Sequence, residues 1–137
     1  MRMIFLDANV LLAYDNESDV HHLKAVQLFQ EIAAGVFGEP LTSDYVFNEI
    51  VGITFRKRGK TPAATMGERI LNSIFILNID DHLFKEAWQI FTKTNLTFNF
   101  VDCTNLVATR LAQAEYIATF DKEFKYVPGI TIIDGTG

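Results

Sequence analysis

Short apolar segments alternate along this chain with longer segments of helical periodicity, and this alternation constrains the fold most. Continuous apolar runs at 4–6 and 74–77 are typical of strands that are buried on both faces of a sheet. Segment 25–32 instead carries apolar residues at i, i+3, i+4 and i+7, which form one face of a helix. Strands that alternate with helices form parallel sheets with helices on both faces. The chain is therefore predicted to be α/β, a three-layer α/β/α sandwich around a central, mostly parallel sheet.

Turn and capping residues set the predicted boundaries. Strands are expected at 4–6, 41–42, 74–77, 116–119 and 130–133. Helices are expected from Ser18 or Asp19 to Gly35, from Ser43 or Asp44 to Gly59, from Thr61 to about Asn72, from Asp80 or Asp81 onward, and from 99–102 onward. The expected buried positions are Val46, Ile50 and Ile53 on the second of these helices, and Val107, Leu111 and Ala114 on the last.

Composition narrows the class of protein. The 137 residues suit one domain, which we place at 1–137, and no repeat or linker interrupts them. A net charge of −5 argues against a protein that coats nucleic acid by bulk electrostatics. Because Cys103 is the only cysteine, an internal disulfide and a cysteine-based zinc site are excluded. No apolar run is long enough to span a bilayer, and Asp7 interrupts the N-terminal run too early for a signal peptide, so we expect a cytoplasmic protein without membrane association.

Acidic residues fall where the predicted sheet places functional sites. Asp7 directly follows the first strand, and Asp121 comes two residues after the fourth. The carboxyl ends of parallel strands share one edge of the sheet, and the helices that follow them begin there. Asp102 lies where a helix opens, and Glu49 lies about a turn and a half into the helix after the second strand. All four carboxylates can therefore reach the same edge.

Each acid also has a simpler explanation. Asp102 or Asp44 suits a helix cap, Glu49 a solvated helix position, and Asp121 a turn. Together these explanations weaken, because Asp7 ends an apolar strand and Glu49 neighbours predicted buried positions. Whether Asp44 joins the group stays open.

Gathered carboxylates favour a metal-dependent reaction. They repel one another in a low-dielectric site unless a cation neutralises them. Mg²⁺ takes oxygen ligands and keeps some of its waters, and such a centre can activate water for attack on a phosphodiester. No Ser-His-Asp arrangement is indicated, since His21, His22 and His82 stand near helix starts and are expected at the surface. The glycines form no phosphate-binding loop.

Four motifs resemble those of PIN domains. The segment 5–12 reads FLDANVLL, as in the opening motif of that family, and Glu49 matches the family's glutamate on the helix after the second strand. Asp102 matches its third acidic position. The segment 119–124 reads TFDKEF and closely resembles the fourth motif. The match runs end to end in the expected order.

The resemblance implies a PIN-like fold and a Mg²⁺- or Mn²⁺-dependent endoribonuclease. It implies metal and catalytic roles for Asp7, Glu49, Asp102 and Asp121, with Asn9 and Thr119 as auxiliary hydrogen-bonding residues. Short members are commonly VapC-like toxins of toxin–antitoxin pairs, inhibited by a small antitoxin protein and often homodimeric. One departure is Ala8, which stands where a Thr or Ser hydroxyl is frequent.

Other readings fit less well. A haloacid-dehalogenase-type phosphotransferase needs a second Asp where Asn9 stands, and a receiver domain needs an acidic pair and a late Lys in a different order. The remaining alternative is a catalytically silent PIN-like module that binds RNA or protein.

Basic and apolar surface residues suggest partners. Phosphate contacts are proposed for Arg56, Lys57, Arg58 and Lys60, and closer to the chemistry for Lys122 and Lys125. The 56–60 cluster has a second explanation, because cations at a helix C-terminus interact favourably with the helix dipole. Ile53, Phe55, Ile74 and Phe75 exceed what the core must hide and are expected to line a two-fold dimer interface.

Overall fold

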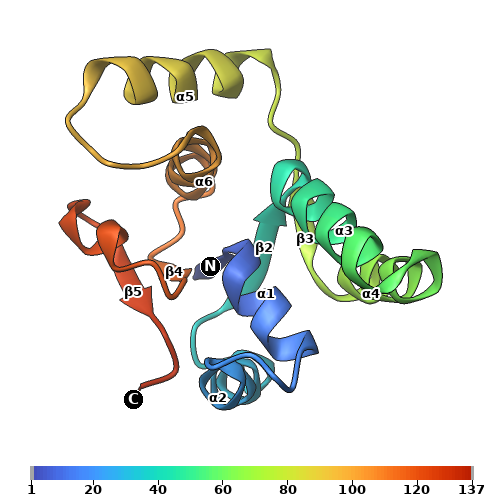
Figure 1. Ribbon diagram of the computed structural model, residues 1–137. Helices are drawn as coiled ribbons and strands as arrows, with labels where there is room; N and C mark the ends of the chain where they lie inside the picture. The colour runs from blue at the N-terminus through green and yellow to red at the C-terminus, as the bar shows by residue number, and fades with distance from the viewer. Residues whose placement is uncertain (1, 137) are drawn as a thin grey trace.

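The computed structural model describes residues 2–136 and contains a five-stranded sheet in the order β3-β2-β1-β4-β5. Every neighbouring pair of strands is parallel, which confirms the predicted α/β class (Figure 1). The elements, in chain order, are β1 (Met3–Leu6), α1 (Ala8–Asp15), α2 (His22–Ala33), β2 (Glu39–Ser43), α3 (Asp44–Arg58), α4 (Lys60–Ser73), β3 (Phe75–Leu77), α5 (Asp81–Lys93), α6 (Phe100–Leu111), β4 (Tyr116–Ala118), the 3-10 helix η1 (Lys122–Tyr126) and β5 (Thr131–Ile133).

Helices cover both faces of the sheet. In Figure 1, α5 and α6 lie on one side, α1 and α2 lie on the other, and α3 and α4 pack together beside β3. Central strand β1 is covered on both faces, so Ile4, Phe5 and Leu6 are fully buried. This double burial explains why the strand is a continuous apolar run rather than an alternating one. None of the helices in the described part of the chain is long and apolar enough to cross a membrane.

The strand order creates a switch point beside β1. The chain runs from β1 outward through β2 and β3, then returns to pair β4 with the other side of β1. Leu6 is in register with Ala118, and the Asp7 N–H donates to the Ala118 carbonyl at 3.0 Å. The carboxyl ends of β1 and β4 therefore meet where open α/β sheets form their sites.

Helix α1 was not predicted, and the helix that follows it begins later than predicted. Asp7 caps α1, since its Oδ1 accepts a hydrogen bond from the Ala8 N–H at 2.7 Å. Helix α2 begins at His22 rather than at Ser18 or Asp19. The Asp19 carboxylate accepts from the His21 N–H, so it closes a tight turn before the helix instead of capping it.

Two residues that were predicted to be buried are not, or only in part. Leu111 is 59% exposed, because α6 ends there and the chain turns through Gln113 at a φ of 54°. Ile53 is only partly buried, and the neighbouring Thr54 faces the core instead.

Three helices begin where the sequence predicted. Ser43 caps α3, Asp80 caps α5 and Asn99 caps α6, each through its side chain. Gly59 ends α3 at a φ of 93°, a left-handed conformation that favours glycine.

Candidate metal centre

Asp7 lies at the C-terminal end of β1 and is held by three hydrogen-bond donors. Its Oδ1 accepts from the Ala8 N–H at 2.7 Å and from Asn105 Nδ2 at 3.3 Å. Its Oδ2 accepts from the Thr119 hydroxyl at 2.8 Å. The side chain is buried, with 7% exposure, so these bonds fix its orientation.

The Thr119 hydroxyl joins β4 to this carboxylate and to two other groups. While it donates to Asp7, its oxygen accepts from Asn9 Nδ2 at 3.2 Å and from the Asp121 N–H at 3.0 Å. Asn9 also accepts from the Phe120 N–H through Oδ1 at 3.2 Å. A hydroxyl has one proton and two lone pairs, so Thr119 is fully used, and it ties the end of β1 to the loop that carries Asp121.

Asp102 and Asp121 are oriented by their own backbone. Asp102 Oδ2 accepts from the Asn99 N–H at 3.1 Å, which completes a capping box at the start of α6. Asp121 Oδ1 accepts from the Glu123 N–H at 2.9 Å and caps η1. Within residues 2–136, the second oxygen of each of these aspartates has no hydrogen-bond donor. Each therefore has one oxygen free to meet a ligand.

The four predicted acids interact electrostatically. Burial raises the pKa of Asp7 to about 6, against the bonds from Thr119 and Ala8, and the charges of Glu49 and Asp121 raise it further. Burial also raises the pKa of Asp102 to about 6, with the charges of Asp7 and Asp121 adding to the effect. Burial, and then the charge of Asp102, raises the pKa of Glu49. The structure thus brings the four acids into one electrostatic group.

This donor set fits a hard divalent cation. Carboxylate oxygens are the ligands that Mg²⁺ and Mn²⁺ prefer, and a cation would relieve the repulsion that adds to the effect of burial on these pKa values. In the described part of the chain, however, no three carboxylate, imidazole or thiol side chains already stand close enough to enclose an ion. Mg²⁺ usually keeps several waters, so some of the four acids would act through water rather than directly.

Comparison with known proteins identifies the family. The family model described as "PIN domain" matches residues 4–130, which is nearly the whole chain. The chain belongs to the PIN-domain family. The resemblance drawn from the four acidic motifs is thereby confirmed. No curated protein matches the chain significantly.

Solved structures share the fold of this PIN domain. The Mycobacterium tuberculosis VapC20, described as a Sarcin-Ricin loop cleaving toxin, aligns with a TM-score of 0.80 at 23% identity, covering 92% of this chain and 95% of its own. DNA-bound VapBC from Salmonella typhimurium aligns with a TM-score of 0.73 at 15% identity, covering 98% and 99%. FitAcB from Neisseria gonorrhoeae gives 0.71 at 15%, covering 97% and 98%. At these identities the likeness concerns the fold.

Asn105 was missed by the sequence analysis. It lies on α6 one turn after Asp102, is completely buried, and donates to Asp7. The available signal was its position: an Asn three residues after a candidate ligand, flanked on both sides by core residues. Asp44, which the sequence left open, has a structural role, because its Oδ1 accepts from the Tyr45 and Ile79 N–H groups and joins α3 to the segment after β3.

The predicted basic residues are exposed but differ in their surroundings. Arg58 Nη1 lies 2.9 Å from Asp15 Oδ2 on α1, so this guanidinium already has a partner. In residues 2–136, no ion pair engages Arg56, Lys57 or Lys60. Lys57 stands two turns beyond Glu49 on α3 and borders a cavity of about 610 Å³ between α1 and α3.

The two lysines near Asp121 and the two histidines at the start of α2 also have defined surroundings. Lys125 lies over the Tyr126 ring, 5.1 Å from its centroid, and Lys122 directly follows Asp121. His21 and His22, expected at the surface, are partly buried: His21 stacks on Phe120 with ring centroids 4.4 Å apart, and His22 Nδ1 contacts the Ala13 carbonyl at 2.8 Å.

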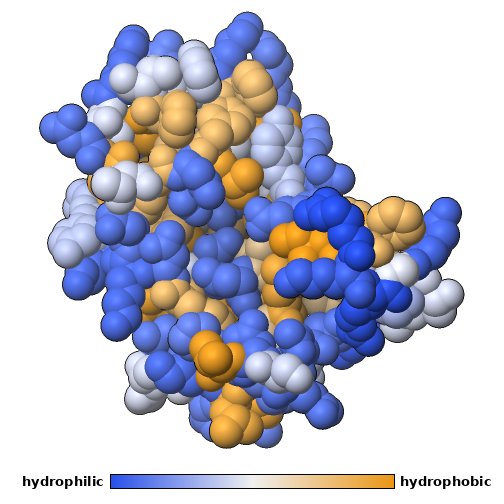
Figure 2. Space-filling view, in the orientation of Figure 1, coloured by the Kyte–Doolittle hydropathy of each residue, from blue (hydrophilic) through white to orange (hydrophobic). Residues whose placement is uncertain are grey.

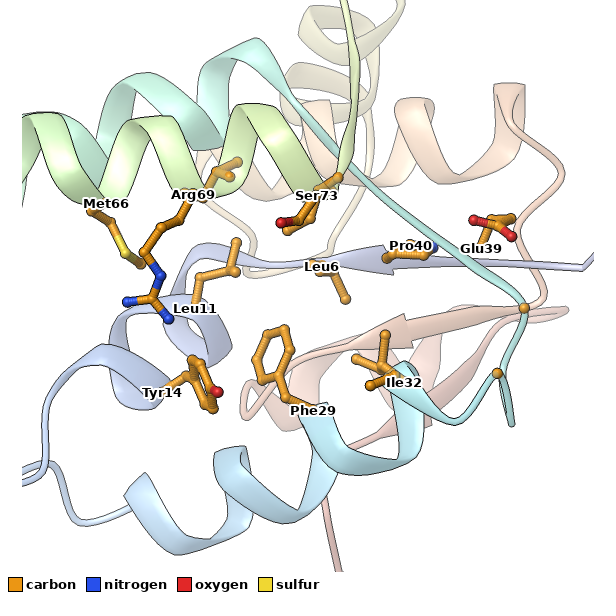
Figure 3. A pocket seen from close by; sticks show the side chains of 15 residues that line it. Leu6, Leu11, Tyr14, Phe29, Ile32, Glu39, Pro40, Met66, Arg69 and Ser73 are labelled. Atoms are coloured by element: carbon orange, nitrogen blue, oxygen red, sulfur yellow. The ribbon is translucent and has the colours of Figure 1, made fainter.

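A second cavity of about 570 Å³ is separate from the acids. It lies between α1, α2 and α4, where Leu11, Phe29 and Ile32 form an apolar wall and Arg69 reaches across one end (Figure 3). None of the four acids lines it. Apolar side chains also gather on the surface over α5 and α6 (Figure 2), where Phe84, Trp88 and Phe91 are about half exposed and surround Phe100.

Proposed function

We propose that this PIN domain is a Mg²⁺- or Mn²⁺-dependent endoribonuclease that hydrolyses RNA phosphodiester bonds. The observation that carries the proposal is the electrostatic coupling of four carboxylates from four separate segments at the switch point of the sheet. Burial is the largest cause of the raised pKa of Asp7, Glu49 and Asp102, and the charges of the other acids in the group add to it. Coupled, partly buried carboxylates are typical of functional sites.

Asp7, Glu49, Asp102 and Asp121 would hold the cation, which supplies a bound water of lowered pKa and stabilises charge on the phosphodiester. Asp7 would provide the most rigid ligand, because three donors fix its carboxylate. Asp102 and Asp121 would each turn a free oxygen toward the same space. Glu49 stands on α3 with a partly exposed side chain, so it can hold or move a proton beside the attacking water.

Thr119 and Asn9 act as auxiliary residues in this proposal. A shift of the Thr119 hydroxyl would disturb Asp7 and the Asp121 backbone together, because one oxygen contacts both. Asn9 holds that hydroxyl on one side and the Phe120 N–H on the other. The two residues therefore keep the β1 and β4 ligands at a fixed separation.

RNA would approach along the exposed surface of α3 and η1. Lys57 lies on the same helix as Glu49, and Lys122 follows Asp121, so both can contact phosphates that flank the reacting bond. Arg56, Lys60 and Lys125 are further candidates for such contacts. Arg58 contributes less, because it is already paired with Asp15.

We also propose that the protein is the toxin of a toxin–antitoxin pair in the cytoplasm and acts as a homodimer. The support comes from proteins of similar fold. One is described as a toxin, and another, from Klebsiella pneumoniae, as part of a toxin–antitoxin complex. Phe55 and Phe75 are 55% and 61% exposed, as a dimer surface requires.

An RNA cleavage assay tests the nuclease proposal. Wild type should cut mixed RNA with Mn²⁺ and not with EDTA, and Glu49→Gln should lose most of that activity. The matched control is Glu68→Gln, which makes the same change at an exposed position on α4 and should cut normally. Wild type that binds RNA without cutting it would refute the proposal and leave the silent binding module.

A further inference from the structure

Asn105 is the one buried polar side chain of the described residues that is only half satisfied. It lies in the middle of α6 with no exposed surface. Its Nδ2 donates to Asp7 Oδ1 at 3.3 Å, while its Oδ1 is buried without a hydrogen-bond partner. A buried amide oxygen left without a donor is unfavourable for folding.

That cost suggests why the residue is an asparagine. A leucine has the same branched shape and would fill the space without leaving a polar atom unsatisfied. The stability of α6 therefore gives no reason for an amide here. The half of the side chain that interacts is the N–H group, and its partner is the buried carboxylate of Asp7.

The lone pairs of Asp7 show what this N–H does. A carboxylate has about four lone-pair sites, two on each oxygen. On Oδ1 both are taken, one by the Ala8 N–H and one by Asn105; on Oδ2 the Thr119 hydroxyl takes one. The single remaining site is on Oδ2. Asn105 thus closes Oδ1 to any further ligand.

We propose that Asn105 is a positioning residue that makes Asp7 a one-oxygen ligand of the cation, through Oδ2. This inference rests on the metal-dependent function proposed above. Mg²⁺ and Mn²⁺ accept single carboxylate oxygens in six-coordinate geometry, whereas Ca²⁺ takes six to eight oxygens and readily binds both oxygens of one carboxylate. Closing Oδ1 therefore disfavours Ca²⁺, so Asn105 also sets the choice of cation.

Binding of Mn²⁺ and of Ca²⁺, measured by calorimetry, tests this role. One variant is Asn105→Leu, which keeps the shape of the side chain. The other is Asn105→Ala, which only removes atoms and serves as the test if the leucine variant does not fold. Thr109→Val is the control, because Thr109 is equally buried one turn further along α6 and bonds only to the Asn105 backbone carbonyl.

Both Asn105 variants should bind Mn²⁺ about tenfold more weakly or worse, as for other groups that orient metal ligands. Their preference for Mn²⁺ over Ca²⁺ should fall, and kcat should drop with little change in the KM for RNA. Thr109→Val should match wild type. The inference is overturned if a folded Asn105 variant keeps the wild-type Mn²⁺ affinity, or keeps the wild-type ratio of the two affinities. Wild type that binds no Mn²⁺ would instead overturn the proposed function.

Discussion

Asp7→Asn should stabilise this protein at neutral pH without metal, although it removes a residue at the centre of the candidate site. Burial and neighbouring acids raise the pKa of Asp7 from 3.8 to about 6. The folded state therefore binds the proton more tightly than the unfolded state does. Stability from this group is complete below about pH 4 and is lost as the pH rises through about 6.

The size of the loss follows from the pKa values. At about 1.4 kcal/mol for each tenfold change in proton affinity, the rise from 3.8 to about 6 corresponds to about 3 kcal/mol at neutral pH. Asparagine has no charge and caps a helix as well as aspartate does. It would, however, lose the bond from Thr119, which costs about 1–2 kcal/mol. The net expectation is a gain of about 1–2 kcal/mol above about pH 7.5.

Urea unfolding in EDTA at two pH values measures this difference. At about pH 4.5 wild-type Asp7 is protonated, so the variant should have no advantage there. Asp80→Asn is the matched control, because Asp80 is also an N-cap but is exposed, and it should change stability by less than about 0.5 kcal/mol at either pH. An Asp7→Asn variant that is less stable than wild type by the same amount at both pH values would refute the raised pKa of Asp7.

Mn²⁺ should reverse the order of the two proteins. A cation that binds only the folded state adds about 2.7 kcal/mol at a hundredfold excess over its Kd. Wild type should gain this in full and the variant much less, while Na⁺ at equal ionic strength should do little for either. Equal stabilisation of both proteins by Mn²⁺ would place the cation elsewhere.

Three further predictions concern activity, RNA and assembly. Asn at Asp102 or Asp121, or Gln at Glu49, should each remove most RNA cleavage, and pairs of these changes should cost little more than single ones because the ligands act as a unit; a single variant with normal turnover would exclude that residue. Replacing Arg56, Lys57 and Lys60 with Gln should weaken RNA binding and flatten its salt dependence by about one unit of slope for each lost phosphate contact, whereas an unchanged slope would return these residues to the helix-end explanation. Light scattering at high micromolar concentration should show a wild-type dimer and a monomeric Phe55→Glu/Phe75→Glu variant, and a monomeric wild type would contradict the assembly.

The sequence predicted those parts of the fold that depend on local patterns. The apolar run at 4–6 marked a strand because β1 is central and buried on both faces. The run at 74–77 also forms a strand, but the expected burial on both faces is wrong, because β3 is at the edge of the sheet and Phe75 is 61% exposed. Ser43, Asp80 and Asn99 marked helix starts because their side chains bond to backbone close by. Helix α1 was not predicted because Val10, Leu11 and Ala13 are all buried. Its sequence therefore lacks the polar face by which a surface helix is identified. Leu111 follows the helical spacing of the buried residues, but α6 ends at this residue, so its side chain is exposed.

Candidate site residues were predictable where the topology alone placed them. Asp7 and Asp121 follow adjacent strands, and in a parallel sheet those ends must coincide. The role of Asn105 could not be read in this manner, because its contact with Asp7 joins residues that are 98 positions apart. Arg58 was proposed to contact phosphate for the same reason, because its partner Asp15 is 43 positions away and could not be foreseen. Long-range pairing of polar side chains has no local signature.

Three of the four acids also begin a helix: Asp7 caps α1, Asp102 completes the capping box of α6, and Asp121 caps η1. Alanine at these positions would remove a structural bond along with the carboxylate, so a loss of activity would not distinguish a missing ligand from a frayed helix. Asparagine keeps the cap and removes the charge. Since the codons for aspartate and asparagine differ by one base, a single mutation would remove a carboxylate that the proposed activity needs and keep the helix cap. On the proposed function, a lineage that loses the activity in this way would keep a folded copy of the protein.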